Sequence, residues 1–310
     1  MDADEKRQRA YMDMDPGHDD ALALVAALKR CTIAGVTTVA GNSTIDKTFL
    51  NAQRVLTVAE ELAVPVLRGS DKPLKRPLFT AEYVHGKSGL DGHEFGPPRA
   101  NVIQGDAVKW LASGLANEHG EVALIATGPE TNVGRLLRDF PDARKKLSKI
   151  VIMGGAFWNR GNVTENAEFN IYVDPEAASI VARSGVPLWM VGLDVTHKAL
   201  FLRKEIPRLR DVRHPVGAML ADLMDFYCKY PWMKGREDFP VHDLLAVYAA
   251  CHPERFEWET GDLVVDQSDE KRGMTTLGVS KGQALANAAK DVDVPSFLDW
   301  TWETLHLYES

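Results

Sequence analysis

The chain has 310 residues, of which 45% are hydrophobic and 26% are charged, so it is an ordinary globular chain that can bury one large core or two smaller ones. Its formal net charge of −8 argues against binding to a nucleic-acid backbone or to an anionic membrane, because both attract basic surfaces. Cys31, Cys228 and Cys251 are far apart in the sequence and lack CxxC spacing, so we expect neither a disulfide framework nor a thiolate zinc site.

The sequence also lacks recognisable targeting and membrane segments. Its first ten residues are charged and have no apolar stretch of the kind that a signal peptide contains. No apolar run is long enough to span a bilayer. Because few cysteines and no disulfide pattern are typical of reducing compartments, we expect a cytoplasmic protein that binds neither membrane nor nucleic acid.

Short β-rich runs alternate with segments of helical spacing over most of the chain. Residues 11–15, 33–39, 122–126, 150–153 and 187–191 are predicted strands, and residues 19–30, 44–62, 104–118, 131–139 and 174–184 are predicted helices. Such alternation is typical of an α/β fold with an open, mostly parallel sheet flanked by helices. We predict a single domain over residues 1–310, with a helical, loop-rich C-terminal part from about residue 197.

Polar residues and glycines follow each predicted strand. They are the segment from Asp13 to Asp20, then Gly41-Asn42, Thr127-Gly128-Pro129, Gly154-Gly155 and Asp194. In an open parallel sheet, ligands bind outside the carboxyl ends of the strands. The sequence therefore predicts an oxygen-rich active site at that edge of the sheet.

Four aspartates, Asp13, Asp15, Asp19 and Asp20, lie within eight residues after the first predicted strand. Repulsion among neighbouring carboxylates would raise some of their pKa values, and a divalent cation removes that repulsion. Oxygen ligands favour Ca²⁺, Mg²⁺ or Mn²⁺ over zinc. One aspartate could instead cap the helix that follows, but a cap requires only one of the four.

These motifs resemble, in the same order, those of the inosine-uridine nucleoside hydrolase family. The segment 13–21 is similar to the family's D-x-D-P-G-x-D-D-A signature. Further similar segments, which extend the resemblance to about residue 280, are Val39-Ala40-Gly41-Asn42, Thr127-Gly128-Pro129-Glu130-Thr131-Asn132, Met153-Gly154-Gly155, the segment 167–178 and Val241-His242-Asp243.

The resemblance implies calcium-dependent hydrolysis of the N-glycosidic bond of purine or pyrimidine ribonucleosides, giving free base and ribose. It implies that Ca²⁺ is held by Asp15, Asp20, Asp243 and the main-chain carbonyl of Thr127, with Asp15 also acting as the general base. The implied substrate-binding residues are Asp19, Asn42, His85, Glu168, Asn170 and Asp243. By analogy with the family, we also expect a homo-oligomer.

Three of these residues carry an additional expectation. Glu168 and Asn170 would bind the ribose 5′-hydroxyl, and in extended backbone they would share a face. The asparagines Asn42 and Asn170 could also serve turn structure alone.

Two histidines and two tyrosines are candidates for a role near the leaving nucleobase. His242 directly precedes Asp243 and is the predicted acid that protonates the leaving base. His85 lies in a glycine-rich loop and either contacts the substrate or is simply exposed. We expect Tyr227 and Tyr230 to be core residues more readily than pocket residues, and we assign no role to the other histidines.

Two other functions compete with nucleoside hydrolysis. A haloacid dehalogenase-type phosphohydrolase also carries D-x-D after its first strand, but Pro16-Gly17 is not its usual continuation. A non-catalytic nucleoside- or ribose-binding protein would need no complete acidic set. Release of ribose from inosine or uridine distinguishes nucleoside hydrolysis from both.

Overall fold

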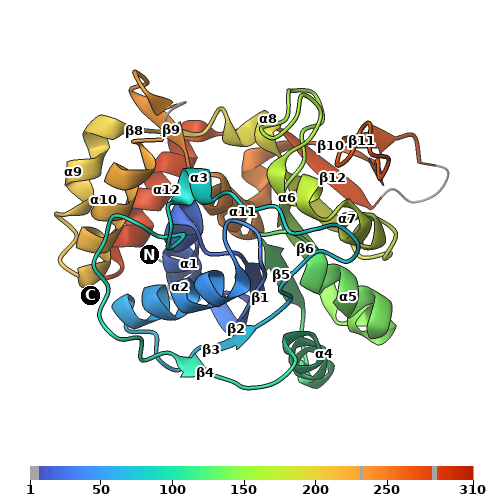
Figure 1. Ribbon diagram of the computed structural model, residues 1–310, viewed down its shortest axis with the longest axis horizontal. Coiled ribbons are helices and arrows are strands. Elements are labelled where there is room, and N and C mark those ends of the chain that lie inside the picture. The colour runs from blue at the N-terminus through green and yellow to red at the C-terminus, as the bar shows by residue number, and fades with distance from the viewer. Residues whose placement is uncertain (1–6, 231–232, 281–284, 310) are drawn as a thin grey trace.

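The computed structural model describes residues 7–230, 233–280 and 285–309. Part of the N-terminal segment considered above, residues 1–6, lies outside this range. A ten-stranded sheet in the order β11-β10-β12-β7-β6-β5-β1-β2-β3-β4 runs through the molecule (Figure 1), and β8 and β9 form a separate two-stranded sheet. The strands are β1 (Gln8–Met14), β2 (Cys31–Thr38), β3 (Pro65–Arg68), β4 (Asn101–Val102), β5 (Val122–Ala126), β6 (Leu147–Met153), β7 (Leu188–Val191), β8 (Leu200–Leu202), β9 (Asp238–Pro240), β10 (Phe256–Val265), β11 (Thr275–Gly278) and β12 (Ala286–Val292).

Helices connect most of these strands. They are α1 (His18–Arg30), α2 (Ile45–Val58), α3 (Glu82–His85), α4 (Ala107–Asn117), α5 (Thr131–Asp139), α6 (Phe169–Val173), α7 (Pro175–Ala182), α8 (Leu193–Thr196), α9 (Ile206–Leu209), α10 (Pro215–Tyr227), α11 (His242–Cys251) and α12 (Val294–His306). Among the residues described, no helix has the length and apolar character needed to cross a membrane.

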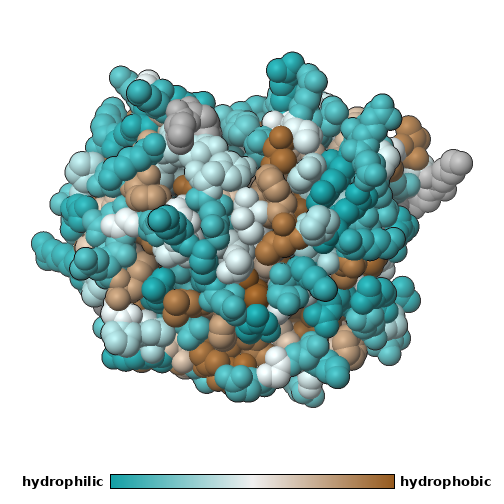
Figure 2. Space-filling view, in the orientation of Figure 1, coloured by the Kyte–Doolittle hydropathy of each residue, from teal (hydrophilic) through white to brown (hydrophobic). Residues whose placement is uncertain are grey.

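The sheet is buried on both faces because its strands alternate side chains between two apolar clusters. Ala10, Met12 and Met14 of β1 pack with α1, α10, α11 and α12, whereas Tyr11 packs with α4 on the opposite face. Figure 1 shows these two groups of helices on either side of the sheet. Hydrophilic residues cover most of the face seen in Figure 2, and smaller groups of apolar residues interrupt them, one near the middle beside α6.

The topology places a crevice at the carboxyl end of β1. From β1 the chain moves outward in parallel through β2, β3 and β4, then returns to pair β5 with the other side of β1. The connections that leave β1 and β5 therefore diverge to opposite sides. Ligands bind at such switch points in open α/β sheets.

The mostly parallel, helix-flanked sheet confirms the predicted fold class. The five predicted strands and five predicted helices are all present, with differences of a few residues at their ends. The expectation of a helical, loop-rich part after residue 197 omitted β10, β11 and β12, which extend the same sheet: β12 pairs in parallel with β7, and β10 pairs antiparallel with both β12 and β11. Because β10 has charged residues at exposed positions and a glycine, its sequence lacks the apolar run of a buried strand.

Candidate active site

A pocket of about 410 Å³ opens at the carboxyl ends of the central strands. Among the described residues that line it, none is Lys or Arg, so the acidic groups in its wall have no permanently charged basic neighbour there. The lining residues that the argument below uses are Asp19, Asn42, His85, Thr127, Glu168, Asn170, His197, Tyr227, Tyr230, His242 and Asp243. The pocket therefore brings together residues from all three thirds of the chain.

Of the four aspartates of the sequence cluster, only Asp19 lines the pocket itself, and the first, Asp13, is held by neighbouring elements. Asp13 is fully buried, and its Oδ1 accepts hydrogen bonds from Thr37 Oγ1 at 2.5 Å and Asn132 Nδ2 at 2.8 Å. Burial raises the pKa of Asp13 to about 7. Asp13 thus ties β1 to β2 and α5, and three aspartates of the cluster remain for chemistry.

Asp15 follows β1 directly and is fully buried. Its Oδ2 accepts a hydrogen bond from the main-chain N–H of Asn42 at 2.6 Å, whereas its Oδ1 has no hydrogen-bond partner among the described residues. A Cβ at Gly41 would lie 2.0 Å from Oδ2, and one at Gly128 would lie 2.7 Å from Oδ1. These two glycines therefore allow the backbone to enclose the Asp15 carboxylate, leaving one oxygen available.

Asp20 lies in the first turn of α1 and accepts hydrogen bonds at both carboxylate oxygens. Oδ2 accepts from the main-chain N–H of Gly17 at 2.9 Å and from Asn42 Nδ2 at 3.1 Å, and Oδ1 accepts from Thr127 Oγ1 at 2.8 Å. The bond from Gly17 is a helix-capping contact, as the alternative interpretation of this aspartate predicted. The hydrogen bonds from Asn42 and Thr127 are not capping contacts. They hold the Asp20 carboxylate at the switch point between β1 and β5.

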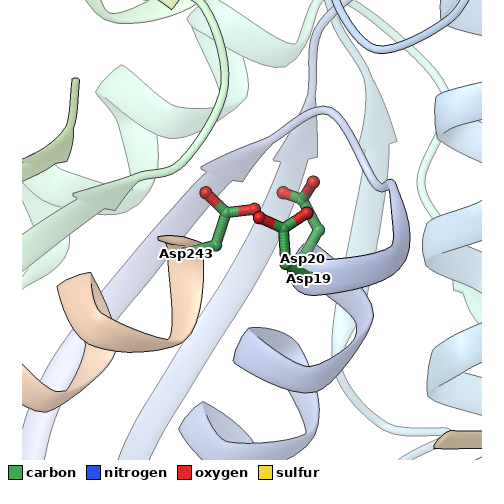
Figure 3. Close-up of side chains that lie close together, drawn as sticks. All are labelled: Asp19, Asp20 and Asp243. Atoms are coloured by element: carbon green, nitrogen blue, oxygen red, sulfur yellow. The ribbon is translucent and has the colours of Figure 1, made fainter. Parts of the chain in front are cut away.

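Three carboxylates converge where α1 and α11 begin. Oxygen atoms of Asp19, Asp20 and Asp243 lie within 4.8 Å of one another, and all three residues are buried. Figure 3 shows the Asp19 and Asp20 side chains extending from α1 and the Asp243 side chain reaching them from α11. Because helices α1 and α11 pack against each other, residues more than 220 positions apart share one site.

The electrostatics of this cluster require a compensating charge. Burial, followed by repulsion from Asp20, raises the pKa of Asp19 to about 7 and that of Asp15 well above its usual value. Burial, followed by the charges of Asp19 and Asp20, likewise raises the pKa of Asp243. A divalent cation relieves such repulsion, and the unpaired Oδ1 of Asp15 and the all-oxygen donor set fit one.

The group that the structure brings closest together differs from the predicted metal ligands. The prediction combined Asp15, Asp20 and Asp243, and assigned Asp19 to the substrate. The compact group contains Asp19 in place of Asp15. Both arrangements share Asp20 and Asp243, which makes these two residues the firmest candidates for ligands.

Thr127 and Asn170 meet at the ends of β5 and β6. Asn170 Nδ2 donates to the main-chain carbonyls of Thr127 at 2.9 Å and Met153 at 3.0 Å. The Thr127 carbonyl retains a second lone pair, so it can still bind a cation. Asn170 is therefore positioned by the strands that build the pocket.

Glu168 also lies in the pocket wall, but the expected extended backbone is wrong. Glu168 is the N-cap of α6, and its carboxylate accepts main-chain hydrogen bonds from Asn170 and Ile171. Gly155 N–H donates a third at 3.2 Å. Glu168 and Asn170 share the pocket because a helix begins there, which gives the free N–H groups of α6 an acceptor.

His242 begins α11 and lies in the pocket wall beside a second histidine. Its Nδ1 lies 2.8 Å from Thr196 Oγ1, and its ring centroid lies 5.6 Å from that of His197. Burial, followed by the charge of His197, lowers the pKa of His242 to about 3. The ring is therefore neutral at neutral pH, with Thr196 engaging one nitrogen.

His85 is buried and lines the pocket, so of its two interpretations the exposed loop residue is wrong. Its Nδ1 lies 3.0 Å from His18 Nδ1 and accepts a hydrogen bond from the His18 main-chain N–H at 3.2 Å. The rings of His18, His85 and Tyr227 stack with centroid distances of 5.3–5.9 Å. His18 thus holds His85 in the wall of the pocket.

Several functional positions carried no signal in the sequence. Tyr227 and Tyr230 were expected to be core residues, and Tyr227 is part of the core while Tyr230 packs against it, but both also line the pocket. Asp194 accepts main-chain hydrogen bonds from Phe157, Trp158 and Asn159, and so orders the loop that contributes part of the pocket wall. Thr196 and His197 lie after β7, in the same connection as Asp194. From the sequence we expect polar residues at this strand end but assign no role to either of them.

Comparison with known proteins gives consistent matches over nearly the whole chain. The family model described as "Inosine-uridine preferring nucleoside hydrolase" matches residues 10–299. The pyrimidine-specific ribonucleoside hydrolases RihA of Salmonella typhi and Salmonella typhimurium are each 41% identical over 307 residues, covering 96% of this chain and 98% of theirs.

Solved structures agree with this similarity. A purine-preferring ribonucleoside hydrolase from Gardnerella vaginalis superposes with a TM-score of 0.92 at 30% identity, covering 97% of this chain and 99% of that one. The plant nucleoside hydrolase PpNRh1 superposes with a TM-score of 0.89 at 29% identity, covering 96% and 99%. The overall arrangement of sheet and helices is therefore shared with enzymes of differing base preference.

Proposed function

Because the chain belongs to the inosine-uridine preferring nucleoside hydrolase family and is a ribonucleoside hydrolase, we propose that it hydrolyses pyrimidine ribonucleosides to free base and ribose with the help of one calcium ion. The observation that carries this proposal is the convergence of Asp19, Asp20 and Asp243 at the wall of the pocket, which Asp19 and Asp243 line, beside the unpaired oxygen of Asp15. Family membership argues against the alternative of a haloacid dehalogenase-type phosphohydrolase.

Asp20, Asp243, Asp15 and the Thr127 carbonyl would hold the calcium ion. All are hard oxygen donors, which Ca²⁺ accepts in loose geometry. When bound, the ion would acidify a water molecule and bind the vicinal hydroxyls of ribose. Asn42 and Thr127 support this role, because their hydrogen bonds fix the Asp20 carboxylate.

Asp15 is the proposed general base. Its Oδ2 is held by the Asn42 N–H, and its Oδ1 can accept the proton of the attacking water. Gly41 and Gly128 enclose the carboxylate, so it cannot rotate away from this position. The raised pKa of Asp15 matches a group that gains a proton during the reaction.

The remaining polar residues are proposed to bind the sugar. Both N–H groups of the Asn42 side chain are engaged by Asp15 and Asp20, which leaves its Oδ1 to accept from a ribose hydroxyl. The side-chain N–H groups of Asn170 are likewise engaged, by the carbonyls of Thr127 and Met153, so its Oδ1 remains to accept a hydrogen bond. Together with Glu168, Asn170 would bind the ribose 5′-hydroxyl. The carboxylates of Asp19 and Asp243 would also stabilise positive charge as the base departs.

His242 is proposed to assist departure of the base. A neutral imidazole carries one proton, and if Thr196 donates to Nδ1, that proton is on Nε2. The Nε2–H can then hydrogen-bond to a carbonyl or nitrogen of the leaving base. The presence of His242 and the pyrimidine specificity stated for the 41% identical relatives support pyrimidine substrates.

Release of ribose from uridine, cytidine, inosine and 2′-deoxyuridine, each with calcium and with a chelator, tests the proposal. We expect calcium-dependent release, fastest with the pyrimidine ribosides. A higher kcat/KM for inosine would contradict the substrate class, and full activity in a chelator would contradict the metal. A homo-oligomeric state and a cytoplasmic location remain predictions from resemblance and composition.

A further inference from the structure

Two cysteines that are far apart in the sequence meet on the side of the sheet that carries α1 and α11. Cys31 follows α1 directly, and Cys251 is the last residue of α11. Their Sγ atoms lie 3.7 Å apart, and both are free thiols. Cys31 is buried, whereas Cys251 is partly exposed, so Cys251 is the one nearer to solvent.

We propose that Cys31 and Cys251 are a site of oxidative modification, at which a low-molecular-weight disulfide converts the two thiols into an intramolecular disulfide joining α1 to α11. The Sγ atoms must approach from 3.7 Å to about 2.05 Å. Because each cysteine lies at the end of its helix, a small backbone adjustment at that end is sufficient.

The surroundings favour attack by Cys251. The hydrogen bond from Cys31 and the positive charge of Lys149 lower the pKa of Cys251, whereas the contact with Cys251 and burial raise the pKa of Cys31. Lys149 is held beside the pair because its Nζ donates to the carbonyl of Ala250 at 2.8 Å. A thiolate at Cys251 is the nucleophile that thiol–disulfide exchange requires.

The exchange takes place in two balanced steps. The Cys251 thiolate attacks one sulfur of the reagent RSSR, forming a mixed disulfide and releasing RS⁻. Cys31 then loses its proton and attacks the Cys251 sulfur, releasing a second RS⁻. The protein dithiol is oxidised by two electrons and the reagent is reduced to two thiols, so no further co-reactant is needed.

The position of the pair determines the expected consequence. The opposite ends of α1 and α11 carry Asp20 and Asp243, which at about 1.5 Å per residue lie about 16 Å from Cys31 and about 12 Å from Cys251 along the helix axes. A movement at the far ends is absorbed before it reaches the acidic cluster. We therefore expect the rate of ribose release to stay within about twofold, while closure of a 220-residue loop raises the temperature of unfolding by several degrees.

The test uses the full chain, reduced and then incubated with oxidised glutathione. Free thiols are counted by alkylation after denaturation, and the linked peptides are identified by mass spectrometry. We expect a loss of two of the three thiols, a mass lower by about 2 Da, and a Cys31–Cys251 peptide pair. Retention of all three thiols, or a lasting glutathione adduct in the unsubstituted chain, would overturn the proposal.

Variants separate this pair from general thiol oxidation. Cys228→Ser is the matched control, because burial raises the pKa of Cys228 to about 11, and this variant should still form the disulfide. Cys31→Ser should instead trap a glutathione adduct at Cys251, and Cys251→Ser should form neither adduct nor intramolecular bond. A disulfide that contains Cys228 would contradict the assignment. The unsubstituted chain is tested directly, so its result decides the proposal even if one of the variants folds poorly.

Discussion

Replacing Asp20 by Asn should have opposite effects on the metal-free and metal-loaded enzyme. At separations up to 4.8 Å and an effective dielectric constant of about 20, each pair of charged carboxylates repels by about 3.5 kcal/mol. Removing the Asp20 charge removes its repulsion with Asp19 and with Asp243, which is about 7 kcal/mol for fully ionised groups at this separation and is smaller where protonation already relieves part of it.

The cost of the substitution is smaller than this gain. Asn keeps one acceptor oxygen for the Gly17 and Asn42 donors, and the hydroxyl of Thr127 can rotate to accept from the new amide. One weakened hydrogen bond costs about 1 kcal/mol. The metal-free Asp20→Asn protein should therefore unfold at a higher temperature than the metal-free parent.

Calcium should reverse that order. A ligand at one hundred times its Kd stabilises the folded state by about 2.7 kcal/mol, which corresponds to roughly 5 °C in a chain of this size. We expect this rise in the parent and its absence in Asp20→Asn, together with a loss of ribose release of at least about 10³-fold. The assay is thermal unfolding in EDTA and in Ca²⁺, with calcium content measured on the same samples.

Asp13→Asn is the matched control, since it changes a buried carboxylate of the same sequence cluster that lies in β1, away from the three converging carboxylates. This variant should keep the calcium-dependent rise in unfolding temperature. An Asp20→Asn protein that calcium stabilises as strongly as the parent, or that is less stable than the parent in EDTA, would refute the reasoning.

Three further predictions concern the sugar and the leaving base. 2′-Deoxyuridine should lose at least about tenfold in kcat/KM relative to uridine, because it leaves buried acceptors unpaired; equal values would contradict sugar binding by Asn42 and Asp19. His242→Ala should slow uridine hydrolysis by about 10²–10⁴-fold but spare p-nitrophenyl riboside, whose leaving group needs no proton; equal losses would assign His242 to shaping the site. Thr196→Val should lower kcat for uridine by about 5- to 30-fold, the loss of one positioning hydrogen bond, with KM little changed; an unchanged kcat would remove Thr196 from the mechanism.

The sequence predicted well where a residue's role follows from its place at a strand end. Asp20, Asn42 and Thr127 each follow a predicted strand, and the parallel sheet brings them together as expected. The pattern could not distinguish Asp13 from Asp15, although one is structural and the other faces the site. That difference depends on their partners, because Asp13 within β1 accepts hydrogen bonds from Thr37 and Asn132, whereas Asp15 lies beyond the end of β1 and accepts from the main chain of Asn42.

Contacts between distant segments were beyond sequence reasoning. Cys31 and Cys251 meet only because α1 packs along α11, and His242 meets Thr196 only because α8 lies beside the start of α11. Nothing in local spacing encodes these pairings. The strands β10 to β12 were missed for a related reason, since their half-exposed positions carry charged residues and their partners are set by tertiary packing.

The two helices at the centre of the fold explain how so many carboxylates can be gathered, and why a cation is still required. Asp19 and Asp20 lie in the first turn of α1, and Asp243 lies in the first turn of α11, where each helix dipole favours negative charge. That stabilisation is about 0.3–1 kcal/mol per carboxylate, and up to ~2 in buried sites. Repulsion of about 3.5 kcal/mol per pair exceeds it. The helix ends can thus orient the three carboxylates toward one point, but only protonation or a divalent cation can balance their charge, and only the cation leaves them ionised for hydrolysis.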